Sequence, residues 1–376
     1  MNAFMGTISG EFYRIINSES GIKHWSFFPN ELTSMVSHFK IDVELTHILT
    51  RTYRLLGILE GTIRNLPDIE PFLYLGMLCE AQKSCAVDGI LAGIDGMFQV
   101  SKQAENDLAV SNYYNTLKNL KKVPVTAEVL CGINQTVMEG TTKKMYGSIR
   151  QSIFFMHPKI FSGSAEYNPP PPEYIPELLK DLEHFIKNES SIDILIKAAV
   201  VYYQFETIHP FECGNGRVGR ILILLMLMNE NILCCPFLPI ASSLLDEQDE
   251  CRHQFFRIQY LGEFSEWITF FVNRVARSAE NALQQIGKAN KLRQMMIEDI
   301  KSYKKTTQTL MNLYNLVEKN PIINVDYASK MLGIAYNTAS KNIGILQELG
   351  ILEQSNDQSR YRQYHYDRLL RIFHFL

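Results

Sequence analysis

The sequence predicts a mainly α-helical protein with a short β-hairpin in its centre and a small helical domain with a second hairpin at its C-terminal end. Most segments repeat apolar residues at helical spacing, and residues 221–228 are apolar on all sides, as in a buried central helix. Strand-like alternation is confined to residues 147–155 and to a stretch after residue 350. At 376 residues, the chain is long enough for two or three domains, each with its own core.

Composition excludes several classes of protein. The 37 basic and 40 acidic side chains nearly balance, so no general attraction to nucleic acid or to an anionic membrane follows. The seven cysteines are odd in number and form no Cys-x-x-Cys, which indicates reduced thiols in a cytoplasmic protein and no structural zinc. The start, Met1 to Gly6, has no basic residue or apolar core, so no signal peptide is expected. The run 221–228 is far below the roughly 18 to 20 residues of a membrane span, and we expect no membrane partner.

Residues 1–105 are predicted to form an N-terminal helical region. Helices are expected from about residue 29 onward, and residues 43–64 carry apolar side chains at helical spacing until Pro67 and Pro71 interrupt them. The next helix starts at Phe72 and continues to about residue 88.

Residues 106–280 are predicted to form the central core, and residues 281–305 a linker helix. Within the core, the alternation in residues 147–155 predicts the short hairpin, with an ordinary surface hairpin as the open alternative to a functional one. The four prolines of residues 169–172 predict a stiff connector. Two strongly apolar helices are expected at residues 194–206 and 221–228.

The C-terminal piece, residues 306–376, has the order helix, turn, helix, wing. Helices are expected over residues 309–319, 326–333 and 337–349, followed by a hairpin, and this order resembles a winged helix-turn-helix domain. Five polar side chains are candidates for contact with DNA: Asn337, Ser340 and Lys341 on the third helix, and Arg360 and Arg362 in the wing. Because charges nearly balance over this domain, a protein-docking or dimerisation module remains an equal alternative.

The stretch between the two apolar helices, from His209 to Arg220, carries the chemistry. Its Gly-Asn-Gly turn allows the backbone to bend tightly, and a helix begins directly after it, where free N–H groups and the helix dipole attract anions. Arg217 and Arg220 are three residues apart, so both project from the first turns of that helix and favour a phosphate site. His209 precedes the turn and is suited to accept a proton near neutral pH.

The same stretch resembles the signature of Fic-domain proteins, His-x-Phe-x-(Asp/Glu)-Gly-Asn-Gly-Arg-x-x-Arg, at every position but one. The resemblance implies a helical Fic core and transfer of AMP from ATP to a Ser, Thr or Tyr hydroxyl of a target protein. It makes His209 the base and Phe211 the anchor of the loop, and it places Arg220 at the γ-phosphate. It implies that the α- and β-phosphates are held by Gly214, Asn215, Gly216 and Arg217. It also implies that the central hairpin is a flap over the active site.

The exception is Cys213, which stands where the family has the Asp or Glu that binds Mg²⁺. A thiol is a poor ligand for a hard cation that prefers oxygen. Three interpretations stay open: Mg²⁺ is held by phosphate oxygens and water alone, the activity is weak, or the donor differs from ATP.

A second motif lies upstream. Ser84, Asp88 and Gly89 fill the positions of the family's inhibitory helix, (Ser/Thr)-x-x-x-Glu-(Gly/Asn), with Asp in place of Glu. By that resemblance the Asp88 carboxylate pairs with Arg220 and blocks the γ-phosphate. In the alternative interpretation, Asp88 only ends its helix and Gly89 is the stop.

Together these observations predict an autoinhibited protein adenylyltransferase of the cytoplasm that uses ATP and Mg²⁺. Two alternatives remain: a nucleotide-sensing, DNA-binding regulator with weak or no transferase activity, and an enzyme that transfers another phosphate-containing group. Whether the protein forms a homodimer is open at this stage.

Overall fold

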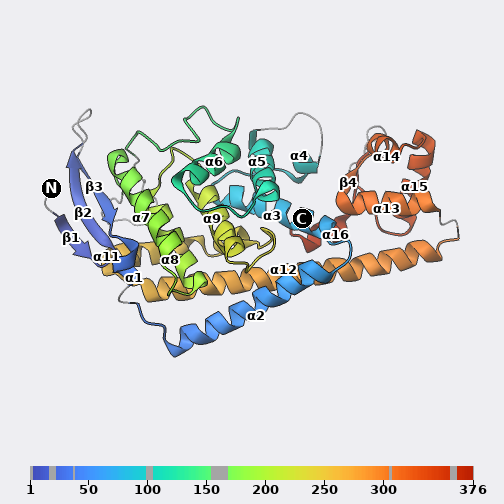
Figure 1. The fold of residues 1–376 in the computed structure, drawn as a ribbon. Helices are drawn as coiled ribbons and strands as arrows, with labels where there is room; N and C mark the ends of the chain where they lie inside the picture. Colours follow the sequence, from blue (N-terminus) through green and yellow to red (C-terminus); the bar gives the residue numbers. More distant parts are fainter. Residues whose placement is uncertain are drawn as a thin grey trace.

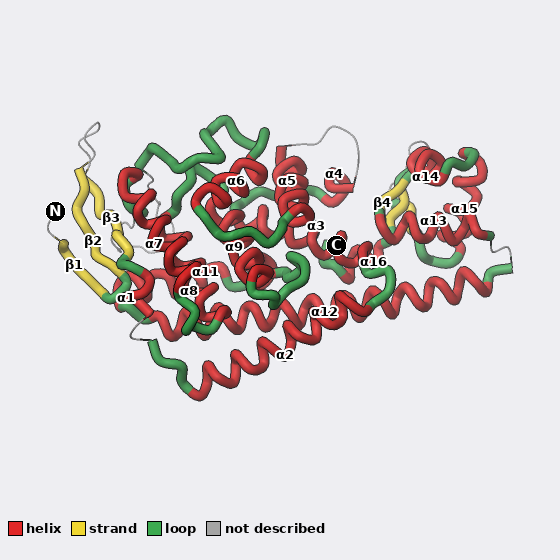
Figure 2. The backbone as a smooth tube through the Cα atoms, viewed as in Figure 1, coloured by secondary structure: helices red, strands yellow, loops and turns green. Residues whose placement is uncertain are grey.

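The computed structural model describes residues 3–16, 23–36, 39–98, 105–153, 168–304, 307–355 and 362–375. These residues are mainly helical, as predicted (Figure 1, Figure 2). In the described parts of the chain, no helix has the length and apolar character needed to cross a membrane.

Two buried helices form the centre of the core. α8 (Ile194–Ile208) starts at Asp193, whose carboxylate accepts the N–H groups of Leu195 and Ile196. α9 (Asn215–Asn229) is buried from Arg217 to Met228, in line with the predicted central helix. Around this pair lie α6 (Ala127–Met138), α7 (Ile175–Asn188) and the short 3₁₀ helix η1 (Pro172–Tyr174).

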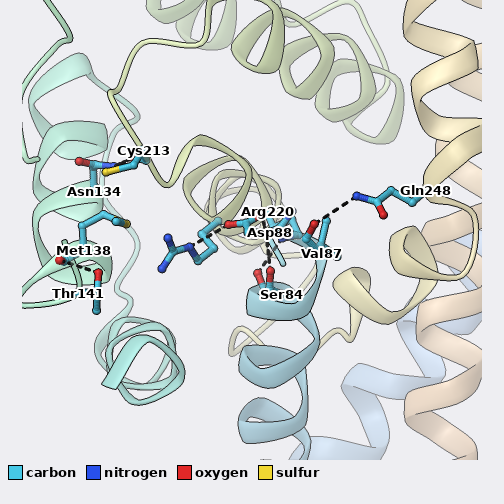
Figure 3. Close-up of polar contacts among 10 residues, drawn as sticks. Ser84, Val87, Asp88, Asn134, Met138, Thr141, Cys213, Arg220 and Gln248 are labelled. Atoms are coloured by element: carbon cyan, nitrogen blue, oxygen red, sulfur yellow. Dashed lines mark hydrogen bonds and ion pairs between the residues drawn. The ribbon is translucent and has the colours of Figure 1, made fainter. Parts of the chain in front are cut away.

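α3 (Glu70–Val87) brings its C-terminal end to the start of α9. It packs against α5 (Glu105–Asn119) and α10 (Ile240–Leu245), and the buried Glu80 carboxylate accepts the N–H of Ala241 in α10. α11 (Gln248–Leu261) holds the last turn of α3, because the Gln248 side chain donates to the Val87 carbonyl at 3.2 Å (Figure 3). The short α4 (Ile94–Phe98) follows α3.

Two long helices lie side by side beneath the core (Figure 1). α12 (Phe264–Ser302) is 39 residues long, and α2 (Val43–Asn65) packs along it. The predicted boundary between core and linker, at residues 280 and 281, therefore falls inside one continuous helix. The predicted linker helix is the later part of α12. The earlier part of α12 packs in the core, where the indole N–H of Trp267 donates to the Ala199 carbonyl of α8.

Helices were expected only from about residue 29 onward, and no strand was predicted before them. β1 (Ala3–Thr7), β2 (Gly10–Ile16) and β3 (Lys23–Pro29) form an antiparallel sheet, and helices begin only with α1 (Leu32–Val36). β2 and β3 are rich in aromatic residues, which favour strands, and the buried rings of Phe12 and Phe27 pack with their centroids 4.9 Å apart.

The predicted central hairpin lies largely outside the described residues. Residues 147–153 contain no strand, and residues 154–167 are among those the structure does not describe. The connector that follows is buried at residues 169–171. Asn168, just before it, accepts the N–H of Phe27 from the N-terminal sheet.

The C-terminal residues form helices and a small sheet in the predicted order. The helices are α13 (Gln308–Lys319), α14 (Val325–Leu332) and α15 (Tyr336–Glu348). The strands β4 (Ile322–Ile323), β5 (Glu353–Gln354) and β6 (Tyr364–His365) pair in the order β4-β6-β5. α15 begins one residue earlier than expected, and the chain closes with α16 (Asp367–Ile372), which the sequence did not indicate.

These C-terminal elements dock on the start of α3. The guanidinium of Arg293, from α12, lies 3.9 Å from the ring centroid of Phe72 and pairs with Glu318 of α13 at 2.7 Å. Phe373, just after α16, packs against the same Phe72 ring. α3 thus meets the C-terminal helices at one end and the turn before α9 at the other.

Candidate active site

The loop between α8 and α9 is fixed by its own residues. α8 ends at His209, which has a left-handed backbone (φ 50°), and its N–H donates to the Phe205 carbonyl at 3.0 Å. Phe211 is fully buried against Phe205. The Asn215 side chain closes the loop, because it accepts the Phe211 N–H at 2.9 Å and donates to the Phe211 carbonyl at 2.8 Å.

Two glycines allow close approach at the start of α9. Gly214 has φ of 80°, and a Cβ there would lie 2.6 Å from the Met138 sulfur. A Cβ at Gly216 would lie 3.0 Å from a carboxylate oxygen of Asp88 and 3.0 Å from Arg220. Since that spacing is tighter than ordinary contact, the absence of a side chain at residue 216 lets both groups reach the helix N-terminus.

The two arginines of α9 share one carboxylate. Nε of Arg217 lies 2.9 Å from Oδ2 of Asp88, and Nη2 of Arg220 lies 3.0 Å from Oδ1. Both arginines are buried, whereas 22% of the Asp88 side chain is exposed. Figure 3 shows Asp88 at the end of α3, directed toward Arg220. Two positive charges therefore meet one negative charge at a helix N-terminus, with the carboxylate on the accessible side.

Ser84 also binds Arg220. Its hydroxyl accepts from Nε at 2.7 Å and its carbonyl accepts from Nη2 at 2.8 Å (Figure 3). Burial alone would lower the pKa of Arg220, but the Asp88 carboxylate outweighs it and the pKa is raised. Asp88 thus pairs with Arg220, as the resemblance implies, and it also ends the backbone of α3, with Gly89 in the left-handed region (φ 81°).

Two further carboxyl groups lie near Arg220. Burial raises the pKa of Glu80 to about 8 and that of Glu206 to about 7. Arg220 acts in the opposite direction on both. Glu80 is therefore largely protonated at neutral pH, whereas Glu206 is partly ionised and offsets part of the positive charge of the two arginines.

The surroundings of His209 disfavour its charged form. Burial first, and then the nearby Arg150 charge, lower its pKa, while the Glu206 carbonyl and Asp88 act in the opposite direction, and the net result is a pKa of about 4. The imidazole is therefore neutral at physiological pH, the form in which a ring nitrogen can accept a hydroxyl proton.

Sequence reasoning missed two residues that hold this loop. The Asn134 side chain donates to the Cys213 carbonyl at 2.9 Å and accepts the Gly147 N–H at 2.8 Å. Arg150 is buried and donates to the His209 carbonyl at 2.7 Å. Neither has a signal in the sequence, because a polar side chain that binds distant carbonyls follows no helical or strand period.

Cys213 and Glu212 do not form a site for a hard cation. Burial raises the pKa of the half-buried Cys213 thiol, and Figure 3 shows it beside Asn134. The Glu212 carboxylate is turned to Ser152, whose hydroxyl donates to it at 2.7 Å. Within the described ranges, no three His, Cys, Asp or Glu side chains are grouped as metal ligands. These protein groups do not fit a Mg²⁺ held by a carboxylate at residue 213.

The candidate DNA-contacting residues are not near His209. Asn337, Ser340 and Lys341 lie exposed on α15, and Arg362 is exposed before β6. Arg360 falls outside the described residues. Figure 1 places α14 and α15 toward the far end of α12 from the N-terminal sheet.

Comparison with known proteins agrees with this geometry. Residues 124–227 match the model of the Fic/DOC family, which confirms the predicted Fic core over that range. "Probable protein adenylyltransferase" of Aquifex aeolicus is 41% identical over 73 residues, and protein adenylyltransferase fic-1 of Caenorhabditis elegans is 30% identical over 123 residues. The matches cover 19% and 32% of this chain, and 23% and 22% of those relatives, so the chain spans about a quarter of their length.

Solved structures support the fold. The structure of a Fic family protein from Desulfovibrio desulfuricans is similar over 87% of this chain and 97% of its own, with a TM-score of 0.55 and 17% identity. A Fic domain-containing signaling protein from Bacteroides thetaiotaomicron is similar over 65% of this chain and 97% of its own, with a TM-score of 0.52 and 17% identity. At this identity the likeness concerns the fold alone.

Proposed function

We propose that the protein is an adenylyltransferase that moves AMP from ATP to a Ser, Thr or Tyr hydroxyl of a target protein, and that Asp88 holds it inhibited. One observation carries the proposal: a neutral imidazole begins the short loop that leads into α9, where two buried arginines share a single, accessible carboxylate. The names of the relatives from Aquifex aeolicus and Caenorhabditis elegans support the same activity.

The roles proposed for the residues of the loop and of α9 are those that the resemblance to Fic-domain proteins implies. His209 takes the proton of the target hydroxyl, whose oxygen forms a bond to the α-phosphorus while the bond to the leaving pyrophosphate breaks. Gly214, Asn215, Gly216 and Arg217 hold the α- and β-phosphates at the N-terminus of α9, and Arg220 holds the γ-phosphate. Phe211 keeps the loop in place from the core. No step is assigned to Mg²⁺, because the groups at residues 212 and 213 do not fit it.

Inhibition follows from the position of Asp88. Its carboxylate lies where the phosphates would contact Arg217 and Arg220, and Ser84 holds Arg220 in the same arrangement. An ATP molecule must displace Asp88 before both guanidinium groups can bind phosphate. Because Asp88 contacts both arginines, displacement costs two charge-assisted hydrogen bonds.

The test is transfer of label from ATP labelled at the α-phosphate, onto the protein itself and onto a lysate. We expect labelling by the Asp88→Asn variant to exceed that by the wild type, and the double variant with His209→Ala to lose it. Equal labelling with and without His209 would remove this residue as the base. An ATP labelled at the γ-phosphate, run in parallel, separates transfer of AMP from transfer of phosphate.

A second candidate is a DNA-binding regulator whose Fic core senses nucleotide. It is favoured by the helix, turn, helix and small sheet after residue 307, which we assign as a winged helix-turn-helix domain, and by the exposed Asn337, Ser340 and Lys341 on α15. A gel-shift with genomic fragments at stated salt, with and without ATP, tests it. Lys341→Ala and Arg362→Ala should weaken any shift, and no shift in either condition would exclude this candidate.

Location and assembly complete the proposal. All seven cysteines are free thiols, which is compatible with the reducing cytoplasm, where we place the protein. A homodimer is tested by sedimentation at several protein concentrations. A mass that stays at the 43.2 kDa of the chain would exclude it.

A further inference from the structure

Arg150 is a buried charge that grips several backbone carbonyls. Its side chain is 1% exposed. Nε donates to the His209 carbonyl at 2.7 Å and Nη1 to the Ser152 carbonyl at 2.8 Å. Nη2 donates to the carbonyls of Pro170 and, at 3.4 Å, Ile208. One guanidinium group therefore joins three segments of the chain: residues 150–152, the proline connector and the end of α8.

Two of these carbonyls belong to the C-terminal end of α8. The last carbonyls of a helix lack partners within it and carry the negative end of its dipole, so a cation there is doubly favourable. The backbone of Arg150 adds a further contact, because its N–H donates to the Pro210 carbonyl at 2.9 Å. The backbone on both sides of the peptide between His209 and Pro210 is thus held by one residue.

The conformation held in this way is a strained one. His209 has φ of 50°, and a left-handed backbone costs a residue with a side chain on the order of 1–3 kcal/mol. Without an outside hold, the end of α8 would relax toward an ordinary helical or extended geometry. The imidazole would then move relative to the start of α9.

We propose that Arg150 is a positioning residue for His209, which fixes the ring against the phosphate-binding end of α9. The inference rests on the proposed function, because it assumes that His209 is the base. Arg150 itself touches no reacting atom. A lysine would keep the charge but not the hold, because three donors on one nitrogen cannot reach carbonyls that a planar, five-donor fork contacts from different sides.

The test compares Arg150→Lys and Arg150→Gln, each in the Asp88→Asn background, with Arg257→Lys as control. Arg257 pairs with Glu263 and Glu266 on the surface and is remote in sequence from the loop. Because misplacement by about 1 Å can cost roughly a hundredfold in rate, we expect kcat to fall by about that factor in Arg150→Lys. KM for ATP should stay within about twofold, since Arg217 and Arg220 are unchanged. Arg257→Lys should alter neither.

A second measurement does not depend on activity. The ring resonances of His209, assigned by their loss in His209→Ala, are followed by NMR as pH is varied. Arg150→Gln removes a positive charge beside the ring, so His209 should titrate at higher pH than in the wild type, whereas Arg150→Lys should shift it less. This outcome supports the positioning role even if no transferase activity is found, and in that case the proposed function fails alone.

Two outcomes would overturn the inference. One is a folded Arg150→Lys variant with kcat within twofold of its parent. The other is an unchanged titration of His209 in Arg150→Gln. If Arg150→Gln does not fold, Arg150→Lys decides through kcat and KM, and an equal loss in nucleotide binding and rate would then indicate a merely structural residue.

Discussion

Two buried arginine–carboxylate clusters lie at the two ends of α3, and they differ in charge balance and access. At the start of the helix, Arg293 pairs with Glu318 one to one, both side chains are buried, and the Phe72 ring covers the guanidinium. At its end, Arg217 and Arg220 share Asp88, which is partly exposed. The first cluster, which we call the closed cluster, is buried and joins two parts of the molecule, α12 and α13. The second has two arginines on one partly exposed carboxylate, and for this reason we propose it, rather than the first, as the ligand site.

The largest effect on stability is expected from removing the carboxylate of the cluster at the start of α3. Glu318→Gln leaves Arg293 buried without a counter-charge, which typically costs about 3–5 kcal/mol of stability. We expect calorimetry to show a clearly lower melting temperature. Glu280→Gln is the matched control, because it breaks an exposed pair with Arg51 worth at most about 1 kcal/mol. If both variants melt alike, the closed cluster does not join the parts as described.

Asp88→Asn at the other end should change binding more than stability. The amide keeps the shape but not the charge, so ATP and ADP no longer compete with a carboxylate for the two arginines. We expect Kd to fall about tenfold or more, which corresponds to about 1.4 kcal/mol. Isothermal calorimetry at fixed salt measures it, with Asp249→Asn, a surface pair with Arg252, as control. An unchanged Kd would mean that Asp88 does not guard the site.

The difference in charge between the two clusters also depends on Glu80 being protonated. An ionised Glu80 carboxylate would neutralise the positive charge of the second arginine beside Asp88. With the pKa raised to about 8, the folded protein favours neutral Glu80, so this contribution to stability is present below about pH 4.5 and is lost as pH rises through 8. Glu80→Gln should therefore flatten the fall in melting temperature between pH 5 and pH 8. Each 1 kcal/mol corresponds to about 2–4 °C in a domain of this size. If the melting temperature of Glu80→Gln followed the pH dependence of the wild type, the loss of stability would come from a group other than Glu80.

The smallest effect should come from adding a carboxylate to the ligand site. Cys213→Asp introduces negative charge close to Arg217, so ATP without Mg²⁺ should bind a few-fold more weakly than to the Asp88→Asn parent. With Mg²⁺ present, ATP should instead bind more tightly to the Cys213→Asp variant than to its parent, because the carboxylate oxygen suits a hard cation. Binding measured with and without Mg²⁺ gives both values. The same sign in both conditions would show that residue 213 faces neither phosphate nor metal.

The candidate site was expected partly from local pattern and partly from the family resemblance. The loop residues are close in sequence, so the glycine turn and the two arginines follow from a local pattern, whereas Ser84 and Asp88 were assigned from the resemblance to the family's inhibitory helix. The contact of Asp88 with Arg217 could not be foreseen, because it depends on how closely α3 approaches Gly216. Arg150 and Asn134 were missed for a related reason, since each acts on backbone carbonyls far away in sequence.

The fold was predictable where apolar periodicity is strong and less so at its edges. The central helices and the C-terminal order of elements follow from their patterns. The N-terminal sheet was missed because its short strands become recognisable only once Phe12 and Phe27 have a partner surface, which α11 supplies through Tyr260. The domain boundary at residue 280 stays a prediction, and it lies within one helix because nothing in residues 264–302 breaks a helix, and Gly287 alone does not.

α12 has a consequence for how the molecule can change over evolution. A continuous helix of 39 residues rises roughly 58 Å, and each residue turns it by about 100°. Deleting a single residue between Ala279 and Arg293 would rotate everything beyond it by that angle, so the C-terminal helices would present a different side to Phe72. The number of residues in α12 therefore sets which surfaces of the two halves of the molecule can meet.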